Sequence, residues 1–192
     1  MTTVSRRILG TAAAIGASLL LALGGSVTAQ AAPSVPAPPK AAPGQSCWYE
    51  LDTGRSLCVA SGTDLSAAVS KAYGVQLTTA ATRSSTTAVR PAATAAPAAS
   101  VVLSQIFDDA GYGGASFVMS VSNGNCATSA YGFADLNTIG WYGRVSSFKS
   151  FNGCRTAIFT ATNFGGSQYG YTTNASSLGS FNDQAKSWRV SG

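Results

Sequence analysis

One pattern occurs twice in the second half of this 192-residue chain and constrains its fold more than any other feature. An aromatic residue, four residues, a second aromatic residue, one residue and a glycine occur at Phe107, Tyr112 and Gly114, and again at Phe159, Phe164 and Gly166. A glycine with positive φ lets a folded hairpin lie under an aromatic ring. Short apolar runs separated by glycine surround both copies, so the repeat predicts two paired β motifs.

Matching segments also follow the two motifs, at residues 141–149 and 181–189, and the first copy is longer because of a segment that contains Cys126. Together these repeats resemble the βγ-crystallin Greek-key family over residues 101–192. The resemblance implies a mainly β fold, with two Greek keys that form one sandwich. It also makes the six motif residues structural ones.

The resemblance also raises the question of calcium. In this family, Asn- and Asp-rich stretches bind calcium through carboxylate, hydroxyl and backbone oxygens, the ligands that Ca²⁺ prefers. The two stretches form a swapped clamp, in which each site takes ligands from both copies. One site would therefore combine Asn182, Asp183 and Ser146 in this chain.

The second site of such a clamp would combine Tyr142, Gly143 and Lys186. A lysine ammonium has no lone pair to offer and repels a divalent cation. We therefore expect at most one calcium site, and a weak one. The alternative is that both stretches have lost calcium and only shape turns.

Composition argues against an enzyme. The chain has no histidine, a single glutamate (Glu50) and only 10% charged residues, which excludes Ser-His-Asp sites and His-ligated zinc. Asp108 and Asp109 are adjacent, so in a strand they point to opposite faces and make no acid–base pair. Lys and Arg number 12, but they are scattered, so we expect no nucleic-acid binding.

Residues 1–31 have the pattern of an export signal. Arg6 and Arg7 precede an apolar run, and Ala29-Gln30-Ala31 forms a cleavage site. Ser5 to Leu9 also resembles a twin-arginine signal, so both the Sec and the twin-arginine route stay open. We expect a secreted, extracellular protein with no membrane span after cleavage.

Two segments rich in Ala, Pro, Ser and Thr, 32–46 and 78–100, predict a disordered stretch and a linker. Between them, residues 47–77 predict a small unit. Two short strands flank an Asp52-Thr53-Gly54 turn, and a helix capped by Thr63 or Asp64 ends at Gly74. The sequence leaves open whether this unit is free or docks on the following domain.

Four cysteines in an exported chain predict two disulfides. We favour Cys47–Cys58, whose members face each other across the predicted turn, together with Cys126–Cys154. The linker separates these two pairs in the sequence.

Several functions are compatible with these features. A structural or binding module, with calcium as its one expected cofactor, competes with a proteinase inhibitor that resembles the streptomycete metalloproteinase inhibitors. In the inhibitor, the segment from Ser122 to Phe133 would be the candidate loop. A secreted antimicrobial toxin of the same fold is a further alternative. The sequence names no partner; an extracellular protease or a cell-surface target fits a monomer of this kind.

Overall fold

The computed structural model describes residues 34–79 and 97–192. The expected signal peptide and residues 80–96 of the expected linker therefore lie outside the described residues. In chain order the strands and the α-helix are β1 (Gln45–Glu50), β2 (Ser56–Ala60), α1 (Leu65–Tyr73), β3 (Val75–Thr78), β4 (Ala98–Phe107), β5 (Ser116–Val121), β6 (Tyr131–Phe133), β7 (Ser147–Ser150), β8 (Arg155–Phe159), β9 (Gln168–Thr172), β10 (Asn174–Ala175) and β11 (Ser187–Ser191). Short 3-10 helices lie at η1 (Ala110–Tyr112), η2 (Leu136–Ile139) and η3 (Gly179–Phe181).

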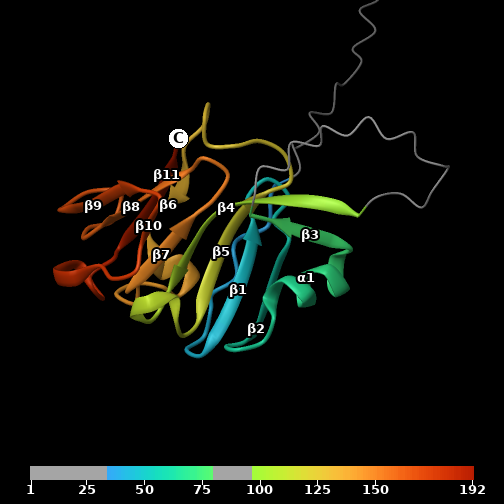
Figure 1. Ribbon diagram of the computed structural model, residues 1–192, viewed down its shortest axis with the longest axis horizontal. Helices are drawn as coiled ribbons and strands as arrows, with labels where there is room; N and C mark the ends of the chain where they lie inside the picture. Colours follow the sequence, from blue (N-terminus) through green and yellow to red (C-terminus); the bar gives the residue numbers. More distant parts are fainter. Residues whose placement is uncertain (1–33, 80–96) are drawn as a thin grey trace, which may run out of the picture. The chain divides into compact units, whose positions relative to one another are not determined.

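The strands form two sheets (Figure 1). The larger sheet has the order β10-β7-β4-β5-β1-β2, with β3 also paired to β4, and the smaller has the order β6-β11-β8-β9. The first repeat supplies β4 to β7, yet its third strand, β6, lies in the sheet of the second repeat. Likewise β10, the third strand of the second repeat, lies in the sheet of the first. This exchange confirms the expected mainly β sandwich of two Greek keys.

The main core fills the space between the sheets. Its largest side chains include Trp141, Trp188 and Phe148, which are fully buried. The Phe117 ring contacts the rings of both tryptophans edge-on, with centroid distances of 6.5 and 6.3 Å. Aromatic rings in this geometry stabilise a core beyond the area that they bury.

The two aromatic motifs have the same geometry in both copies. The rings of Phe107 and Tyr112 lie 5.7 Å apart edge-on, and those of Phe159 and Phe164 lie 5.8 Å apart edge-on. Gly114 and Gly166 both have positive φ, at 73° and 75°. A Cβ at Gly166 would lie 2.6 Å from Thr160 Oγ1 and 3.0 Å from a backbone nitrogen, so the turn requires glycine.

The N-terminal unit forms as the sequence predicts. Strands β1 and β2 pair in antiparallel register with Cys47 opposite Cys58. Asp64 caps α1 by accepting the backbone N–H of Ala67 at 2.9 Å, and Gly74 ends the helix with φ 64°. The local signals for a turn, a cap and a helix end are therefore sufficient to place these elements.

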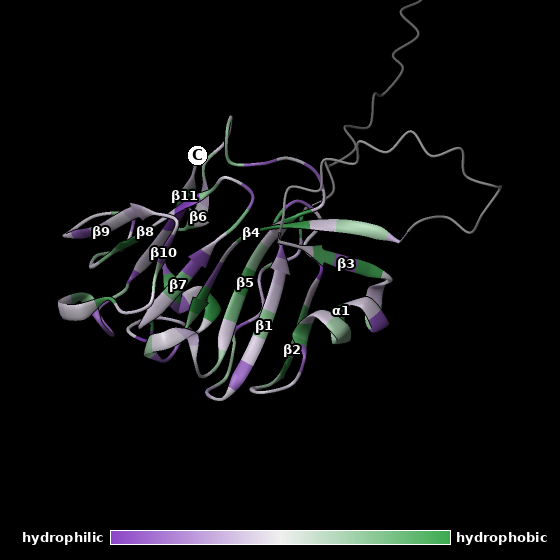
Figure 2. Cartoon of the chain, in the orientation of Figure 1, coloured by the Kyte–Doolittle hydropathy of each residue, from purple (hydrophilic) through white to green (hydrophobic). Residues whose placement is uncertain are grey.

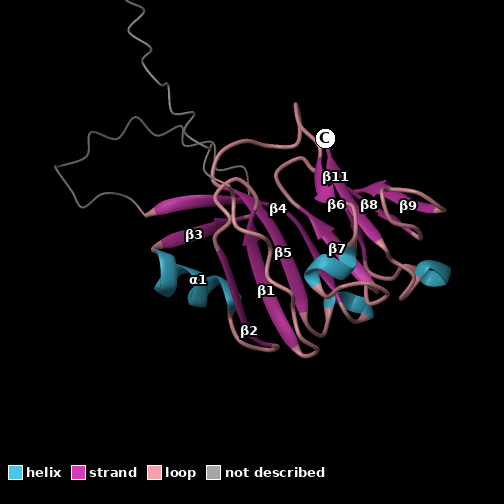
Figure 3. Ribbon diagram, turned by 180° about the vertical axis from the view of Figure 1, so that it is seen from behind, coloured by secondary structure: helices cyan, strands magenta, loops and turns pink. Residues whose placement is uncertain are grey.

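This unit extends the sandwich. Strand β1 pairs in parallel with β5, and β3 pairs in parallel with β4. A second, smaller core lies on the face of the large sheet opposite to the main core; it consists of Trp48, Leu65, Val69, Val75, Val102 and Val118. Figure 2 shows the hydrophobic stretches of β2 and β3, and Figure 3 shows α1 beside these strands. We call residues 34–79 the N-terminal extension.

The stretch expected to be disordered, residues 32–46, is ordered from Ser34 onward, which corrects the prediction. Ala41 is buried and donates its N–H to Ile139 O at 2.9 Å, and the Tyr49 hydroxyl donates to Pro36 O at 2.7 Å. A segment with few large apolar residues is held here by backbone and hydroxyl hydrogen bonds.

The expected linker is also shorter at both ends, because Thr78 belongs to β3 and Ala98 begins β4.

Both expected disulfides are present. Cys47–Cys58 closes the β1–β2 hairpin, and Cys126–Cys154 ties the segment after β5 to the residue before β8. On the loop-entropy account each contributes about 3 kcal/mol to the free energy of unfolding. Within the described residues no cysteine is free.

Candidate functional site

The structure brings the three expected calcium ligands together. Ser146 precedes β7 in the first repeat, whereas Asn182 and Asp183 follow η3 in the second. The Ser146 hydroxyl donates to Asp183 Oδ1 at 3.2 Å, and the Asn182 amide donates to Asp183 Oδ2 at 2.7 Å. We call these three residues the Asp183 clamp. It joins the repeats, as the swapped arrangement requires.

Backbone contacts hold the Asp183 clamp in place. The N–H of Asp183 donates to Val145 O at 3.1 Å, and the N–H of Leu178 donates to Ser146 O at 3.0 Å. Asp183 has a φ of 57°, in the left-handed region that Asn and Asp tolerate best among residues with a side chain. Asn182 and Asp183 are exposed while Ser146 is buried, so an ion could approach from solvent.

The donor set suits a weakly held Ca²⁺. One carboxylate, one amide oxygen and one hydroxyl are hard ligands, but Ca²⁺ takes six to eight oxygens, so water and backbone carbonyls would supply the rest. Binding would replace both hydrogen bonds to the Asp183 carboxylate, because Ser146 and Asn182 would turn oxygen lone pairs toward the ion. Among residues 34–79 and 97–192, no group of three or more His, Cys, Asp or Glu side chains is placed to hold a metal.

The partner site, which we call the Lys186 clamp, has the same backbone and different side chains. Gly143 N–H donates to Ala185 O at 2.8 Å, the counterpart of the Asp183 to Val145 bond. Gly143 has a φ of 65°, close to that of Asp183. The Lys186 ammonium lies 5.6 Å from the centroid of the Tyr142 ring, where it makes a cation–π contact. The positive charge of Lys186 therefore lies in the Lys186 clamp, where the swapped arrangement would place a second calcium ion.

A second candidate site is the loop of residues 122–130 between β5 and β6, which covers most of the segment expected as an inhibitory loop. Its residues are exposed apart from Cys126, whose disulfide ties the loop to Cys154. Cys126 O accepts the N–H of Gly192 at 2.8 Å, and Asn125 Oδ1 accepts the N–H of Ala127 at 2.8 Å. The loop is therefore exposed, and its conformation is held by a disulfide and by hydrogen bonds. Phe133, the last residue of the expected segment, lies in β6 and is buried.

Asp108 has a structural partner. Its two carboxylate oxygens accept from Arg144 Nε at 3.0 Å and from Arg144 Nη2 at 2.8 Å. The same guanidinium donates to Gly140 O at 2.7 Å and stacks over Trp141. This bidentate pair ties the first motif to the loop that precedes the Ser146 side of the clamp.

The residue that sequence reasoning missed is Asp52. The sequence places it only in the β1–β2 turn, but its carboxylate accepts hydrogen bonds from Ser122 and Asn123, seventy and seventy-one positions along the chain. Burial would raise the pKa of Asp52, but the hydrogen bonds from Ser122 and Asn123 outweigh it and hold the pKa below its usual value of 3.8. No local pattern indicates a contact over this separation.

No family model matches the chain, and no curated protein matches it significantly. Solved structures do match it. A βγ-crystallin domain from Flavobacterium johnsoniae is 27% identical, with 46% of this chain and 92% of that domain covered and a TM-score of 0.35. One from Clostridium beijerinckii is 24% identical, covering 46% and 97%, with a TM-score of 0.37. A βγ-crystallin from Ciona intestinalis is 24% identical, covering 44% and 94%, with a TM-score of 0.34.

These matches span about half of the chain. The chain's own features define the fold: the twice-repeated motif, the exchanged third strands and the matched backbone bonds of the two clamps. On this basis the two repeats form a βγ-crystallin-like sandwich. The N-terminal extension continues its larger sheet.

The part of the chain that the structure describes includes no helix that is long and apolar enough to cross a membrane.

Proposed function

We propose that this chain is a secreted, non-catalytic structural or binding module whose βγ-crystallin-like domain carries one calcium site, the Asp183 clamp. The observation that carries the proposal is the contact between Ser146 and Asp183, which joins two repeats through hard oxygen ligands. An ion held there would link the loops of both Greek keys. Export is supported by the leader pattern of residues 1–31.

Calcium would act as a stabiliser of the folded state. The clamp exists only when the two repeats are packed, so the ion binds the folded protein and raises the free energy of unfolding by RT ln(1+[Ca²⁺]/Kd). At ten times Kd this amounts to about 1.4 kcal/mol, or about 3–6 °C in Tm for a chain of this size.

Thermal unfolding in calcium and in chelator tests the proposal. The purified protein should melt a few degrees higher in millimolar calcium than in chelator, and Asp183→Ala should remove this difference. Asp135→Ala is a matched control, because the carboxylate of Asp135 accepts the N–H of Asn137 and no group of Ser146, Asn182 or Asp183. A wild-type Tm that calcium leaves unchanged would contradict the proposal.

A second candidate function is proteinase inhibition through the 122–130 loop. The observation that favours it is the bracing of an exposed segment by a disulfide, by Gly192 and by Asp52. A loop fixed in one conformation binds a protease cleft with a smaller loss of entropy, and it resists cleavage. The sequence from Ser122 to Phe133 has no charged residue, so inhibition should depend little on salt.

Assays against thermolysin and subtilisin test this second candidate. Inhibition of either enzyme at micromolar protein, with the loop left intact, supports it. Rapid cleavage between Ser122 and Ala130, or full protease activity at that concentration, would exclude these two classes of protease as partners.

A further inference from the structure

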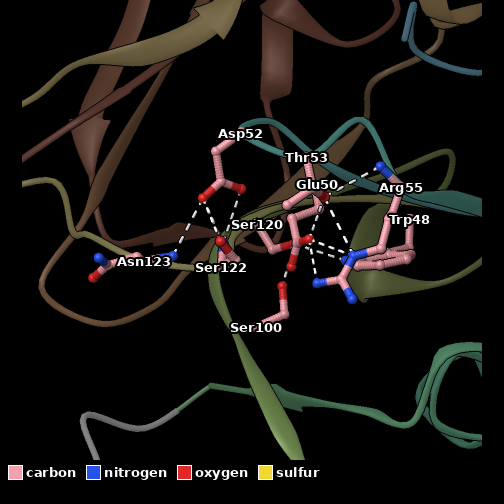
Figure 4. Close-up of polar contacts among 9 residues, drawn as sticks. All are labelled: Trp48, Glu50, Asp52, Thr53, Arg55, Ser100, Ser120, Ser122 and Asn123. Atoms are coloured by element: carbon pink, nitrogen blue, oxygen red, sulfur yellow. Dashed lines mark hydrogen bonds and ion pairs between the residues drawn. The ribbon is translucent and has the colours of Figure 1, made fainter. Parts of the chain in front are cut away.

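The turn between β1 and β2 lies against the start of the 122–130 loop (Figure 4). Asp52 Oδ1 accepts the N–H of Ser122 at 2.9 Å. Asp52 Oδ2 accepts the Ser122 hydroxyl at 2.6 Å and the N–H of Asn123 at 3.3 Å. Both oxygens of one carboxylate therefore engage two successive residues of the loop.

A second carboxylate fixes the shape of that turn. Glu50 is fully buried, and its Oε2 accepts from the Thr53 hydroxyl and from Arg55 Nε at 2.7 Å. Gly54 N–H donates to Glu50 O at 2.8 Å and closes the turn. Figure 4 shows Glu50 directed toward Thr53 and Arg55, and Asp52 directed toward the loop. These hydrogen bonds fix the turn that carries Asp52.

The backbone joins the turn to strand β5 directly before the loop. Leu51 N–H donates to Ser120 O at 2.9 Å, one residue beyond the last pair of the β1–β5 ladder. The loop thus leaves the sheet beside Asp52. A carboxylate that accepts two backbone N–H groups and a hydroxyl holds them more strongly than a neutral acceptor would.

We propose that Asp52 is a positioning residue for the 122–130 loop, through which the N-terminal extension sets the conformation of an exposed surface of the βγ-crystallin-like domain. The disulfide and Gly192 hold the loop at Cys126, and Asp52 holds it at Ser122 and Asn123. The extension thus supplies an anchor that residues 101–192 do not contain. The use of this surface against a protease rests on the second candidate function above.

Amide hydrogen exchange measured by NMR on the full secreted chain tests the proposal. In Asp52→Ala the amides of Ser122 and Asn123 should exchange roughly tenfold faster or more, because each loses a charge-assisted hydrogen bond. Core amides such as that of Ile158 should keep their rates. Asp64→Asn is the matched control, since Asp64 lies in the same extension but its carboxylate accepts the N–H of Ala67 and none from the loop.

A spectroscopic signature separates positioning from general stability. In the wild type, the amide proton shifts of Ser122 and Asn123 should change together with the ionisation of Asp52, and in Asp52→Asn this titration should vanish. Unchanged exchange at both amides in Asp52→Ala, or a uniform increase over the whole chain, would overturn the proposal.

Protease assays then distinguish the two ideas. If the wild type inhibits thermolysin or subtilisin, Asp52→Ala should raise the inhibition constant roughly tenfold, in step with the faster exchange. Faster exchange at Ser122 and Asn123 without inhibition by the wild type would support the positioning role and count against the second candidate function. Inhibition by the wild type that Asp52→Ala leaves unchanged would count against the positioning role.

Discussion

The Asp183 and Lys186 clamps share a backbone and differ in chemistry. Asp183 and Gly143 occupy matching positions with φ of 57° and 65°, and each donates its N–H across the repeats. Yet one position carries a carboxylate and the other no side chain, and the hydroxyl of Ser146 is matched by the ammonium of Lys186. Both repeats have the motif glycine with positive φ and exchange a strand. The same backbone therefore accommodates different polar side chains in the two clamps.

The largest expected effect is on the free energy of unfolding, and it concerns the motif glycines that the two repeats share. Gly114→Ala and Gly166→Ala should each lower the free energy of unfolding by about 2–4 kcal/mol, because the strain of a positive φ and the steric clash of the new Cβ both destabilise the folded state. The closest atom to the new methyl is Asp109 Oδ2 at 2.7 Å in one copy and Thr160 Oγ1 at 2.6 Å in the other. Urea denaturation gives both values.

Gly153→Ala is the control for these substitutions. Gly153 has a φ of 77°, and nothing lies within 4 Å of the position that a Cβ would take there, so the substitution should cost only about 1–2 kcal/mol. A loss at Gly114 and Gly166 no greater than at Gly153 would show that the folded hairpins are not tightly packed.

The next prediction converts one clamp into the other. Gly143→Asp combined with Lys186→Ser should raise the number of calcium ions bound per molecule from one to two, with a second rise in Tm of about 3–6 °C at ten times Kd. A Cβ at Gly143 lies 3.3 Å from Asp183 O, a contact that a shift of a few tenths of an ångström relieves. Titration calorimetry measures the number of sites.

Gly143→Asp alone is the control, since Lys186 stays in place and repels the ion. This single variant should still bind one calcium ion. Two ions bound by it would mean that the lysine does not decide the difference between the clamps.

The smallest expected effect is on the pH dependence of the free energy of unfolding. It concerns the first repeat alone, because only this longer copy has a loop held by Asp52. The pKa of Asp52 is lower in the folded chain than in the unfolded chain, so its contribution is complete above the usual value of 3.8 and is lost as the pH falls through the folded pKa. Asp52 is exposed, so we expect less than about 1 kcal/mol. Urea denaturation below pH 4 of the wild type and of Asp52→Asn should converge; a constant gap would contradict this.

Features encoded locally could be predicted from the sequence. The aromatic motif, the Gly54 turn, the Asp64 cap and the Gly74 helix end each depend on residues a few positions apart, and the structure has all of them. The disulfides follow from parity and from the position of Cys58 opposite Cys47. The members of the Asp183 clamp come from the family resemblance, since no local rule connects Ser146 with Asp183.

Long-range pairing could not be predicted in the same way. The alternation of apolar and polar residues in β1 does not indicate that β1 pairs with β5. A parallel partner depends on the packing of both faces of the sheet. One signal was available: the apolar runs Val101-Val102-Leu103 and Phe117-Val118-Met119 imply strands covered on both faces. Val102 and Val118 indeed pack against the N-terminal extension, whereas Leu103 and Phe117 belong to the main core.

Calcium titration calorimetry of the wild type beside Ser146→Ala and Asp183→Ala tests the central claim most directly. We predict one site in the wild type and a loss of binding in both variants, although they alter different repeats. Two equal sites in the wild type, or unchanged affinity in Ser146→Ala when Asp183→Ala removes binding, would contradict a single clamp shared between the repeats.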